Sequence, residues 1–99
     1  MSEAIRRLLV AYDVAEDPRR DRVAVTLQRF GERVQYSVFV IDGRPADFVR
    51  LKYALETIID VDTDRVLFCD LGPREITHRR MTFIGRKPTL SGDSPTLII

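Results

Sequence analysis

Apolar residues recur along the chain in short blocks, and their spacing switches between that of a strand and that of a helix. Residues 7–14 are almost continuously apolar, which predicts a buried strand that ends close to Asp13. In residues 17–30 the apolar positions are three or four apart, which predicts a helix with one buried face. Asp17 is expected to cap this helix, and Gly31 is expected to end it in a left-handed conformation.

The second half of the chain repeats this order loosely, with extended segments on either side of another helix. Residues 34–42 are rich in β-branched and aromatic side chains and predict extended structure, which Asp42-Gly43 would end in a turn. Pro45 is expected to open a second helix, because apolar positions then step by three and four as far as Ile59. Three further strands are predicted at residues 65–71, 81–85 and 95–99.

Two helices on one face of a mostly antiparallel sheet predict an α+β fold, the ferredoxin-like βαββαβ sandwich, as a single domain over residues 1–99. That fold needs two strands between its helices, so residues 33–42 must bend sharply or form a tight hairpin near Tyr36 and Ser37. An apolar strand at the end of a small domain must pair with something. We therefore expect a homodimer in which residues 95–99 pack on a second copy of the chain.

Composition restricts the class of protein. The 99 residues are 44% hydrophobic and 31% charged, which excludes disordered and fibrous proteins. No apolar run is long enough for a membrane and no signal pattern opens the chain, so we expect a cytoplasmic protein without a membrane partner. The single cysteine, Cys69, fits a reducing compartment and is expected to pack in the core. Phosphate-loop, GxSxG and HExxH motifs are absent, which excludes those enzyme classes.

The charge balance is close to zero, at 16 basic and 15 acidic residues, but its composition is unusual. Arginine accounts for 14 of the 16 basic residues, with Lys52 and Lys87 the other two. The planar guanidinium binds phosphate with two parallel hydrogen bonds, which lysine cannot do. On composition alone, a GC-rich or thermophilic genome is the simpler explanation of the bias, so the positions of the arginines must decide. Arginines gather in residues 19–33 and acids in residues 56–64. Such segregation predicts a basic face on a nearly neutral protein.

Asp13 is the first candidate for chemistry, because it stands where a strand leaves the core. A carboxylate there is expected to be desolvated and retained for a reason, although capping of the following loop is an equal explanation. One carboxylate is a poor magnesium site, since Mg²⁺ takes oxygen ligands in octahedral geometry. A symmetric dimer would bring two copies of Asp13 together around one metal ion, which could activate water and neutralise a phosphodiester.

Two other polar residues have competing explanations. Asp70 follows Val66-Leu67-Phe68-Cys69 at the end of that apolar stretch, and it is either a second metal ligand or a strand-end residue that faces solvent. His78 is the only histidine, so a zinc cluster of usual spacing cannot form within one chain, and a solvated position in a loop is expected.

Three segments together carry a family resemblance. They are Tyr12-Asp13-Val14, then Asp17-Pro18-Arg19-Arg20-Asp21-Arg22-Val23, then Gly31-Glu32-Arg33-Val34-Gln35-Tyr36-Ser37-Val38-Phe39. In this order and spacing the chain resembles, over nearly its whole length, the second CRISPR-associated (Cas) protein of the adaptation module. It departs from the family where Arg44 replaces the usual Thr or Ser before Pro45, which removes that helix cap.

The resemblance implies a ferredoxin-like homodimer whose C-terminal strands pack on the partner's sheet. It implies Mg²⁺-dependent cleavage of single-stranded RNA or double-stranded DNA, with Mn²⁺ as a possible substitute, and a role in the complex with the CRISPR integrase that inserts spacer DNA. Asp13 would be the catalytic residue and metal ligand. Residues that would bind nucleic acid or support the site are Tyr12, Arg20, Arg22, Arg33, Ser37 and Phe39, the last at the site or the dimer seam.

Three functions therefore compete. The first is a metal-dependent nuclease with paired Asp13 residues, and the second is a nucleic-acid-binding scaffold for the integrase in which Asp13 is dispensable. The third is a ferredoxin-like small-ligand or regulatory domain that is merely rich in arginine, and fold alone supports it.

Overall fold

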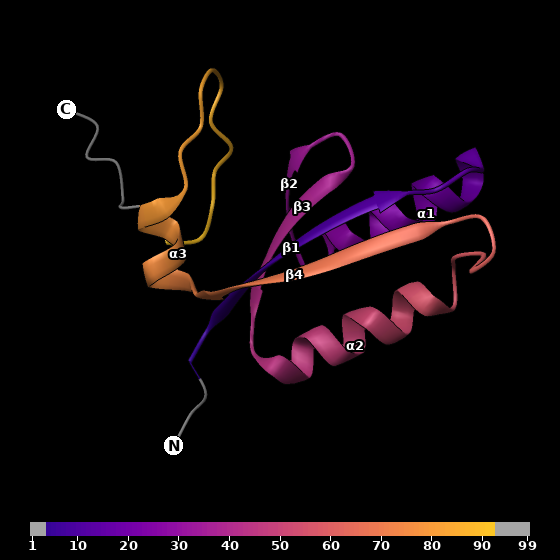
Figure 1. Ribbon diagram of the computed structural model, residues 1–99, viewed down its shortest axis with the longest axis horizontal. Helices are drawn as coiled ribbons and strands as arrows, with labels where there is room; N and C mark the ends of the chain where they lie inside the picture. Colours follow the sequence, from indigo (N-terminus) through magenta and orange to yellow (C-terminus); the bar gives the residue numbers. More distant parts are fainter. Residues whose placement is uncertain (1–3, 93–99) are drawn as a thin grey trace.

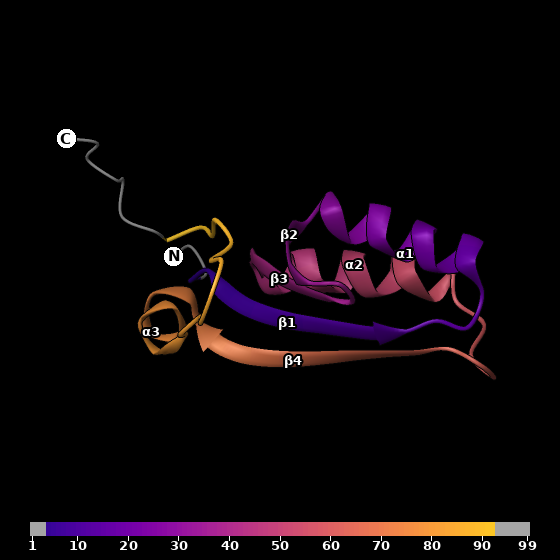
Figure 2. The same ribbon diagram turned by 90° about the horizontal axis from the view of Figure 1, so that it is seen from above.

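The computed structural model describes residues 4–92, which form one antiparallel sheet with two helices on one of its faces (Figures 1 and 2). The strands are β1 (Arg6–Asp13), β2 (Gly31–Gln35), β3 (Val38–Gly43) and β4 (Arg65–Pro73), in the spatial order β2-β3-β1-β4. Helices α1 (Asp17–Gln28) and α2 (Pro45–Glu56) follow β1 and β3. This order is that of the ferredoxin-like sandwich, so the predicted fold class is confirmed.

The core lies between the sheet and the two helices. Alternate side chains of β1 point toward the helices, as strand geometry requires, and Val10 there is completely buried. Phe39 of β3 and the helix residues Leu27 and Leu51 are also fully buried against it. Burial of side chains of this size stabilises a fold by about 1.5–3 kcal/mol each relative to exposure.

The hairpin between the helices forms where it was expected, with Tyr36 and Ser37 as its turn. The expected left-handed cap at Gly31 is wrong, because α1 has already ended at Arg29 in right-handed helical conformation. Gly31 instead begins β2, where a Cβ atom would lie 2.2 Å from the carbonyl oxygen of Val40. Close approach of two strands, rather than backbone conformation, is the reason for glycine at this position.

The helix starts also differ from expectation. Asp17 lies inside the first turn of α1, makes no capping bond, and pairs with Arg20 three residues later. At α2 the missing Thr or Ser is replaced by Asp47, whose carboxylate accepts a 2.9 Å hydrogen bond from the Arg44 N–H. The residues predicted as a turn before α2, Asp42-Gly43, are instead the last two of β3.

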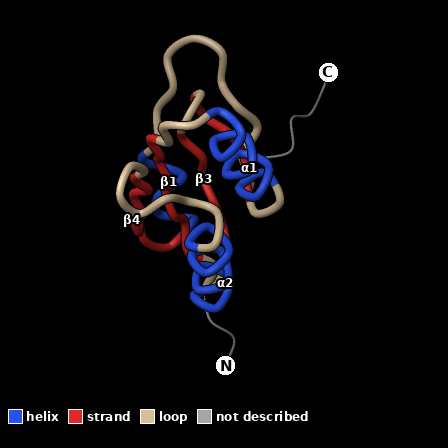
Figure 3. The backbone as a smooth tube through the Cα atoms, turned by 90° about the vertical axis from the view of Figure 1, so that its right-hand side faces the viewer, coloured by secondary structure: helices blue, strands red, loops and turns tan. Residues whose placement is uncertain are grey.

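The chain after β4 contradicts the predicted strand at residues 81–85. Helix α3 (Arg74–Arg80) comes first, and residues 81–92 follow without regular structure as a long loop (Figures 1 and 3). The Arg74 N–H donates to the Ile5 carbonyl at 3.0 Å, so α3 begins beyond the end of the sheet and carries the chain away from it. The expected strand at 95–99 lies outside the described residues. Within residues 4–92 no helix has the length and apolar character required to cross a membrane.

A buried ion pair holds this loop against the sheet. Arg7 is fully buried, contrary to the prediction of an almost entirely apolar strand, and its guanidinium meets Asp42 of β3 through two bonds of 2.7 and 2.9 Å. It also lies 3.0 Å from Nδ1 of His78 and donates at 2.5 Å to the carbonyl of Ser91. His78 is thus part of this network on α3 and is not a solvated loop residue.

The second face of the sheet carries apolar side chains that no helix covers. In β4, Val66 and Phe68 pack against the core, and strand alternation therefore turns Leu67 and Cys69 to the other side. Both are exposed, so the expectation that Cys69 packs in the core is wrong. Their register partners in β1 are Ala11 and Leu9, which lie on the same face. We call this surface the open face.

Candidate functional site

Asp13 is the last residue of β1, and its side chain points to the open face, away from the two helices, whereas its neighbours Tyr12 and Val14 are buried in the core. Its side chain is exposed, so the expected desolvation is wrong. No hydrogen bond or ion pair joins its carboxylate to any residue within 4–92, so it does not cap the following loop either. The carboxylate is therefore free to bind a ligand at the end of a rigid strand.

Behind Asp13, on the helix side of the sheet, four of the predicted residues come together. Tyr12 is buried and stacks on Phe39, with ring centroids 6.3 Å apart. The guanidinium of Arg33 lies over the Phe39 ring at 5.1 Å, and its Nη2 reaches the Tyr12 hydroxyl at 3.5 Å. The carbonyl of Ser37 accepts a 3.1 Å hydrogen bond from the Tyr12 N–H. These contacts fix the backbone that carries Asp13. Because Phe39 is fully buried, it supports the site from within and cannot line a seam with another chain.

The loop after Asp13 is held from one side by Arg20. Its guanidinium donates to the carbonyl of Val14 at 3.2 Å from Nε and 2.9 Å from Nη2. The neighbouring Asp17 carboxylate pairs with the same guanidinium and raises the pKa of Arg20 above its usual value. Arg20 is consequently committed to the loop and supports the site through the backbone.

Asp64 holds the same loop from the other side, and its role was not foreseen. Its carboxylate accepts from Nε of Arg19 at 2.8 Å, from the Ala15 N–H at 3.0 Å and from the Asp60 N–H at 2.9 Å. The side chain is completely shielded from solvent. The sequence signal for this role is an acidic residue just before β4, which from sequence alone is indistinguishable from the rest of the acidic stretch at 56–64.

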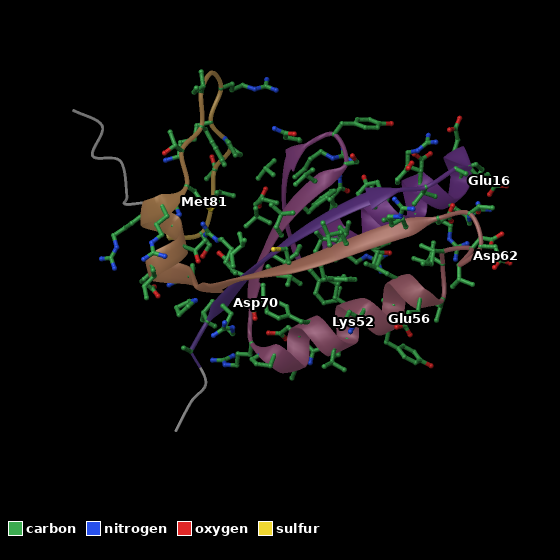
Figure 4. The ribbon with its side chains drawn as sticks, in the orientation of Figure 1. Glu16, Lys52, Glu56, Asp62, Asp70 and Met81 are labelled. Atoms are coloured by element: carbon green, nitrogen blue, oxygen red, sulfur yellow. The ribbon has the colours of Figure 1, made fainter. Side chains whose placement is uncertain are left out.

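The predicted segregation of charge is therefore wrong at this end of the molecule. The basic start of α1 and the acidic segment before β4 meet there, because Arg19 binds Asp64 and also contacts Glu16 at 3.2 Å. Glu16 and Asp62 both lie toward this end of the molecule, whereas Asp70 lies toward the α3 end (Figure 4). Acidic and basic segments that are distant in sequence thus neutralise each other instead of forming separate faces.

Acid is expected to weaken the fold through Asp64. The hydrogen bond from Arg19, followed by those from Ala15 and Asp60, holds the pKa of this carboxyl well below its usual range. A depressed folded-state pKa adds stability that is fully present above the unfolded value of about 4 and is lost as pH falls toward the folded value. Asp64→Asn should therefore lower the urea midpoint clearly at neutral pH, and the difference from the wild type should shrink below about pH 4. A constant difference at all pH values would contradict this assignment. The exposed Asp62→Asn serves as the control.

Arg22 does not join the site. It is exposed on the outer surface of α1, where it lines a shallow hollow with Arg29 and Ile58. None of its contacts reaches Asp13 or Tyr12, so its predicted role in binding nucleic acid applies to a different part of the surface.

Asp70 is not placed to act with Asp13. It pairs with Leu8 in the β-ladder, five residues from Asp13, which is roughly 17 Å along the strand. Its carboxylate is bound by Arg6 at 3.0 and 3.1 Å, and this bond, with one from the Gly72 N–H, lowers the pKa of Asp70. Asp70 is half-exposed and ion-paired, but it is not a strand-end residue, because β4 continues to Pro73.

No cluster of three or more His, Cys, Asp and Glu side chains suitable for a metal exists among residues 4–92. Within this described part of one protomer, the Asp13 carboxylate is therefore not part of a ready-made cluster of three ligands. Mg²⁺ is commonly held by one or two carboxylates while it keeps several waters. An exposed, unpartnered carboxylate fits that requirement when a second copy supplies another.

Comparison with known proteins gives one consistent result. The family model of CRISPR associated protein Cas2 matches residues 6–79, from the first residue of β1 almost to the end of α3. The Rhodospirillum rubrum protein named CRISPR-associated endoribonuclease Cas2 3 is 38% identical over 96 residues, which cover 92% of this chain and 99% of that protein.

Comparison with solved structures points to the same family. Streptococcus pyogenes Cas2 has a TM-score of 0.70 and 38% identity, over 80% of this chain and 99% of that one. A chain of a partial Cas6-RT-Cas1–Cas2 complex has a TM-score of 0.62 and 28% identity, over 80% and 90% of the two chains. The family match, over residues 6–79, spans every strand and helix that positions Asp13.

Proposed function

This chain belongs to the Cas2 family of CRISPR-associated proteins, and from that premise we propose that it is an endoribonuclease whose catalytic residue is Asp13. The observation that carries the proposal is the free, exposed Asp13 carboxylate on a strand end that Tyr12, Arg20 and Asp64 immobilise. The name of the Rhodospirillum rubrum relative supports RNA as substrate. Double-stranded DNA is the second substrate that we propose.

We propose that Asp13, with the same residue of a second protomer, holds Mg²⁺, for which Mn²⁺ can substitute. When bound, such an ion lowers the pKa of water and offsets negative charge on a phosphodiester. The chain's own contribution is preorganisation, because hydrogen bonds on both sides of the 14–16 loop keep the Asp13 backbone fixed. A fixed carboxylate needs no rearrangement as the reaction proceeds.

A homodimer is the assembly we propose, with the open face as its contact surface. Leu67 is 55% exposed there, and no helix covers it or its neighbours Leu9 and Ala11. An antiparallel sheet that faces water normally carries polar side chains on that side. Exposed apolar side chains on a sheet face therefore favour association, and Asp13 lies on the same face.

The proposal predicts that cleavage needs both a metal ion and the dimer. EDTA should abolish cleavage of labelled single-stranded RNA, and Mg²⁺ or Mn²⁺ should restore it while Ca²⁺ does not. Leu67→Glu should yield a folded monomer, by sedimentation and circular dichroism, with cleavage reduced on the order of 100-fold or more. A fully active monomer, or cleavage that persists in EDTA, would rule out the shared-metal site. Tyr53→Glu, at an exposed residue on α2, is the control.

The likeness to a chain of a complex that contains Cas1 favours a second function. We propose that the protein also serves as a subunit of the spacer integrase complex in CRISPR adaptation. If this scaffold role is independent of cleavage, Asp13→Ala will leave spacer acquisition intact. Loss of both activities would instead mean that the two roles share the carboxylate.

A further inference from the structure

Arg65 stands directly opposite Asp13 in the antiparallel ladder between β1 and β4. Paired residues of adjacent strands project their side chains on the same face, with Cβ atoms about 5 Å apart. Both side chains are exposed on the open face, yet no ion pair joins them, and the Arg65 guanidinium has no hydrogen-bonded partner within residues 4–92. A cation and an anion are thus presented side by side at one strand end.

The other arginines near Asp13 are already engaged. Arg19 is bound to Asp64, and Arg20 holds the Val14 carbonyl. Arg33 lies over the Phe39 ring on the opposite side of the sheet. Arg65 is therefore the arginine next to Asp13 whose guanidinium binds no other side chain within residues 4–92.

Its backbone is also fixed, because the preceding residue is Asp64, whose carboxylate is shielded from solvent and hydrogen-bonded to α1, the 14–16 loop and Asp60. A guanidinium on an anchored strand end is suited to bidentate phosphate binding, since its fork matches two phosphate oxygens.

We propose that Arg65 is a substrate-positioning residue that binds a backbone phosphate of the nucleic acid next to the Asp13 site. The inference rests on the proposed nuclease function and adds to it the group that places the scissile phosphate at the carboxylate. The sequence placed Arg65 only at the start of a strand; the strand register puts it beside Asp13.

The test measures binding separately from cleavage. Fluorescence anisotropy of labelled single-stranded RNA, in EDTA and over a series of NaCl concentrations, compares the wild type with Arg65→Ala, Arg65→Lys and Arg44→Ala. Arg44 is an exposed arginine that follows β3 at the opposite end of the sheet. Arg65→Ala should weaken binding about tenfold. Its slope of log K against log salt should decrease by about 0.7, the value for one lost phosphate contact on a single strand. Arg65→Lys should keep the slope, and Arg44→Ala should match the wild type.

Kinetics give an independent readout. Arg65→Ala should raise KM about tenfold with a much smaller change in kcat, and Tm should not change, because the side chain is exposed. Binding and slope equal to those of Arg44→Ala would overturn the inference. So would unchanged RNA affinity with tighter Mn²⁺ binding, since Arg65 would then be only a counter-ion of Asp13. If the wild type itself cleaves no RNA with any metal, the proposed nuclease function fails, and the anisotropy result still decides whether Arg65 binds phosphate.

Discussion

Asp13→Ala is expected to lower kcat for RNA cleavage on the order of 1000-fold while Tm stays the same. A catalytic metal supplies several kcal/mol of transition-state stabilisation, and each ~1.4 kcal/mol is a factor of ten in rate. Stability should be unaffected, because the carboxylate is exposed and bonds to no residue within 4–92. A surface change of this kind alters the free energy of unfolding by less than about 0.5 kcal/mol. Single-turnover cleavage and differential scanning calorimetry measure the two quantities.

The matched control is Asp62→Ala, which removes another exposed carboxylate at the same end of the molecule (Figure 4). It should cleave like the wild type. Retained cleavage in Asp13→Ala would indicate a contaminating nuclease, and a large fall in its Tm would show a structural role that the contacts do not support.

Mixed dimers test whether the two carboxylates act on one ion. Equal amounts of wild type and Asp13→Ala are mixed and exchange protomers at random. If the site is shared, the mixture should have about a quarter of the activity of the same total amount of wild type, because only the pure wild-type dimers have a complete site. Independent sites would leave about half. The ratio therefore separates one shared metal from two separate ones without a structure of the dimer.

The fold was predictable because local signals and packing agree. The apolar spacing of α1 and α2 and the need for two strands between them predict a hairpin at Tyr36-Ser37, where the structure has it. The prediction from local sequence was wrong where a contact with a distant part of the chain determines the structure. Gly31 fits a helix end by local rules, but close contact with Val40 determines it. The strand predicted at 81–85 has the right side chains, yet α3 carries it off the sheet.

The site was predictable only in part, because some of its residues belong to a local motif and others are brought to it by strand pairing. The motif order places Tyr12, Asp13, Arg33 and Phe39, and the structure brings them to one strand end. Burial could not be read from the motif, because Asp13 stands between the buried residues Tyr12 and Val14 but projects from the open face of the sheet. The roles of Asp64 and Arg65 could not be predicted, because they depend on the pairing of β4 with β1, which local sequence does not reveal.

The largest expected loss of stability comes from Asp42→Ala, which would leave the Arg7 guanidinium buried without its carboxylate. Arg7 is fully shielded from solvent, and the Asp42 side chain is only 13% exposed. Removal of one partner of a buried ion pair costs about 3–5 kcal/mol, because the remaining charge is uncompensated. That is a large share of the roughly 5–15 kcal/mol by which a domain is stable. Urea unfolding followed by circular dichroism measures the loss.

The double variant Arg7→Met/Asp42→Leu separates the cost of the stranded charge from the role of the pair. Apolar residues in place of a buried ion pair are often neutral or stabilising, so most of the lost free energy should return. The attachment of the loop at 81–92 to the sheet should not return, because the Ser91 carbonyl of this loop accepts its hydrogen bond from the Arg7 guanidinium. Hydrogen exchange in this loop should therefore stay fast in the double variant although the sheet is again protected. If the loop regained protection too, Arg7 would be only a core residue; if stability did not return, the hydrogen bonds of Arg7 to α3 and the loop would outweigh its pairing with Asp42.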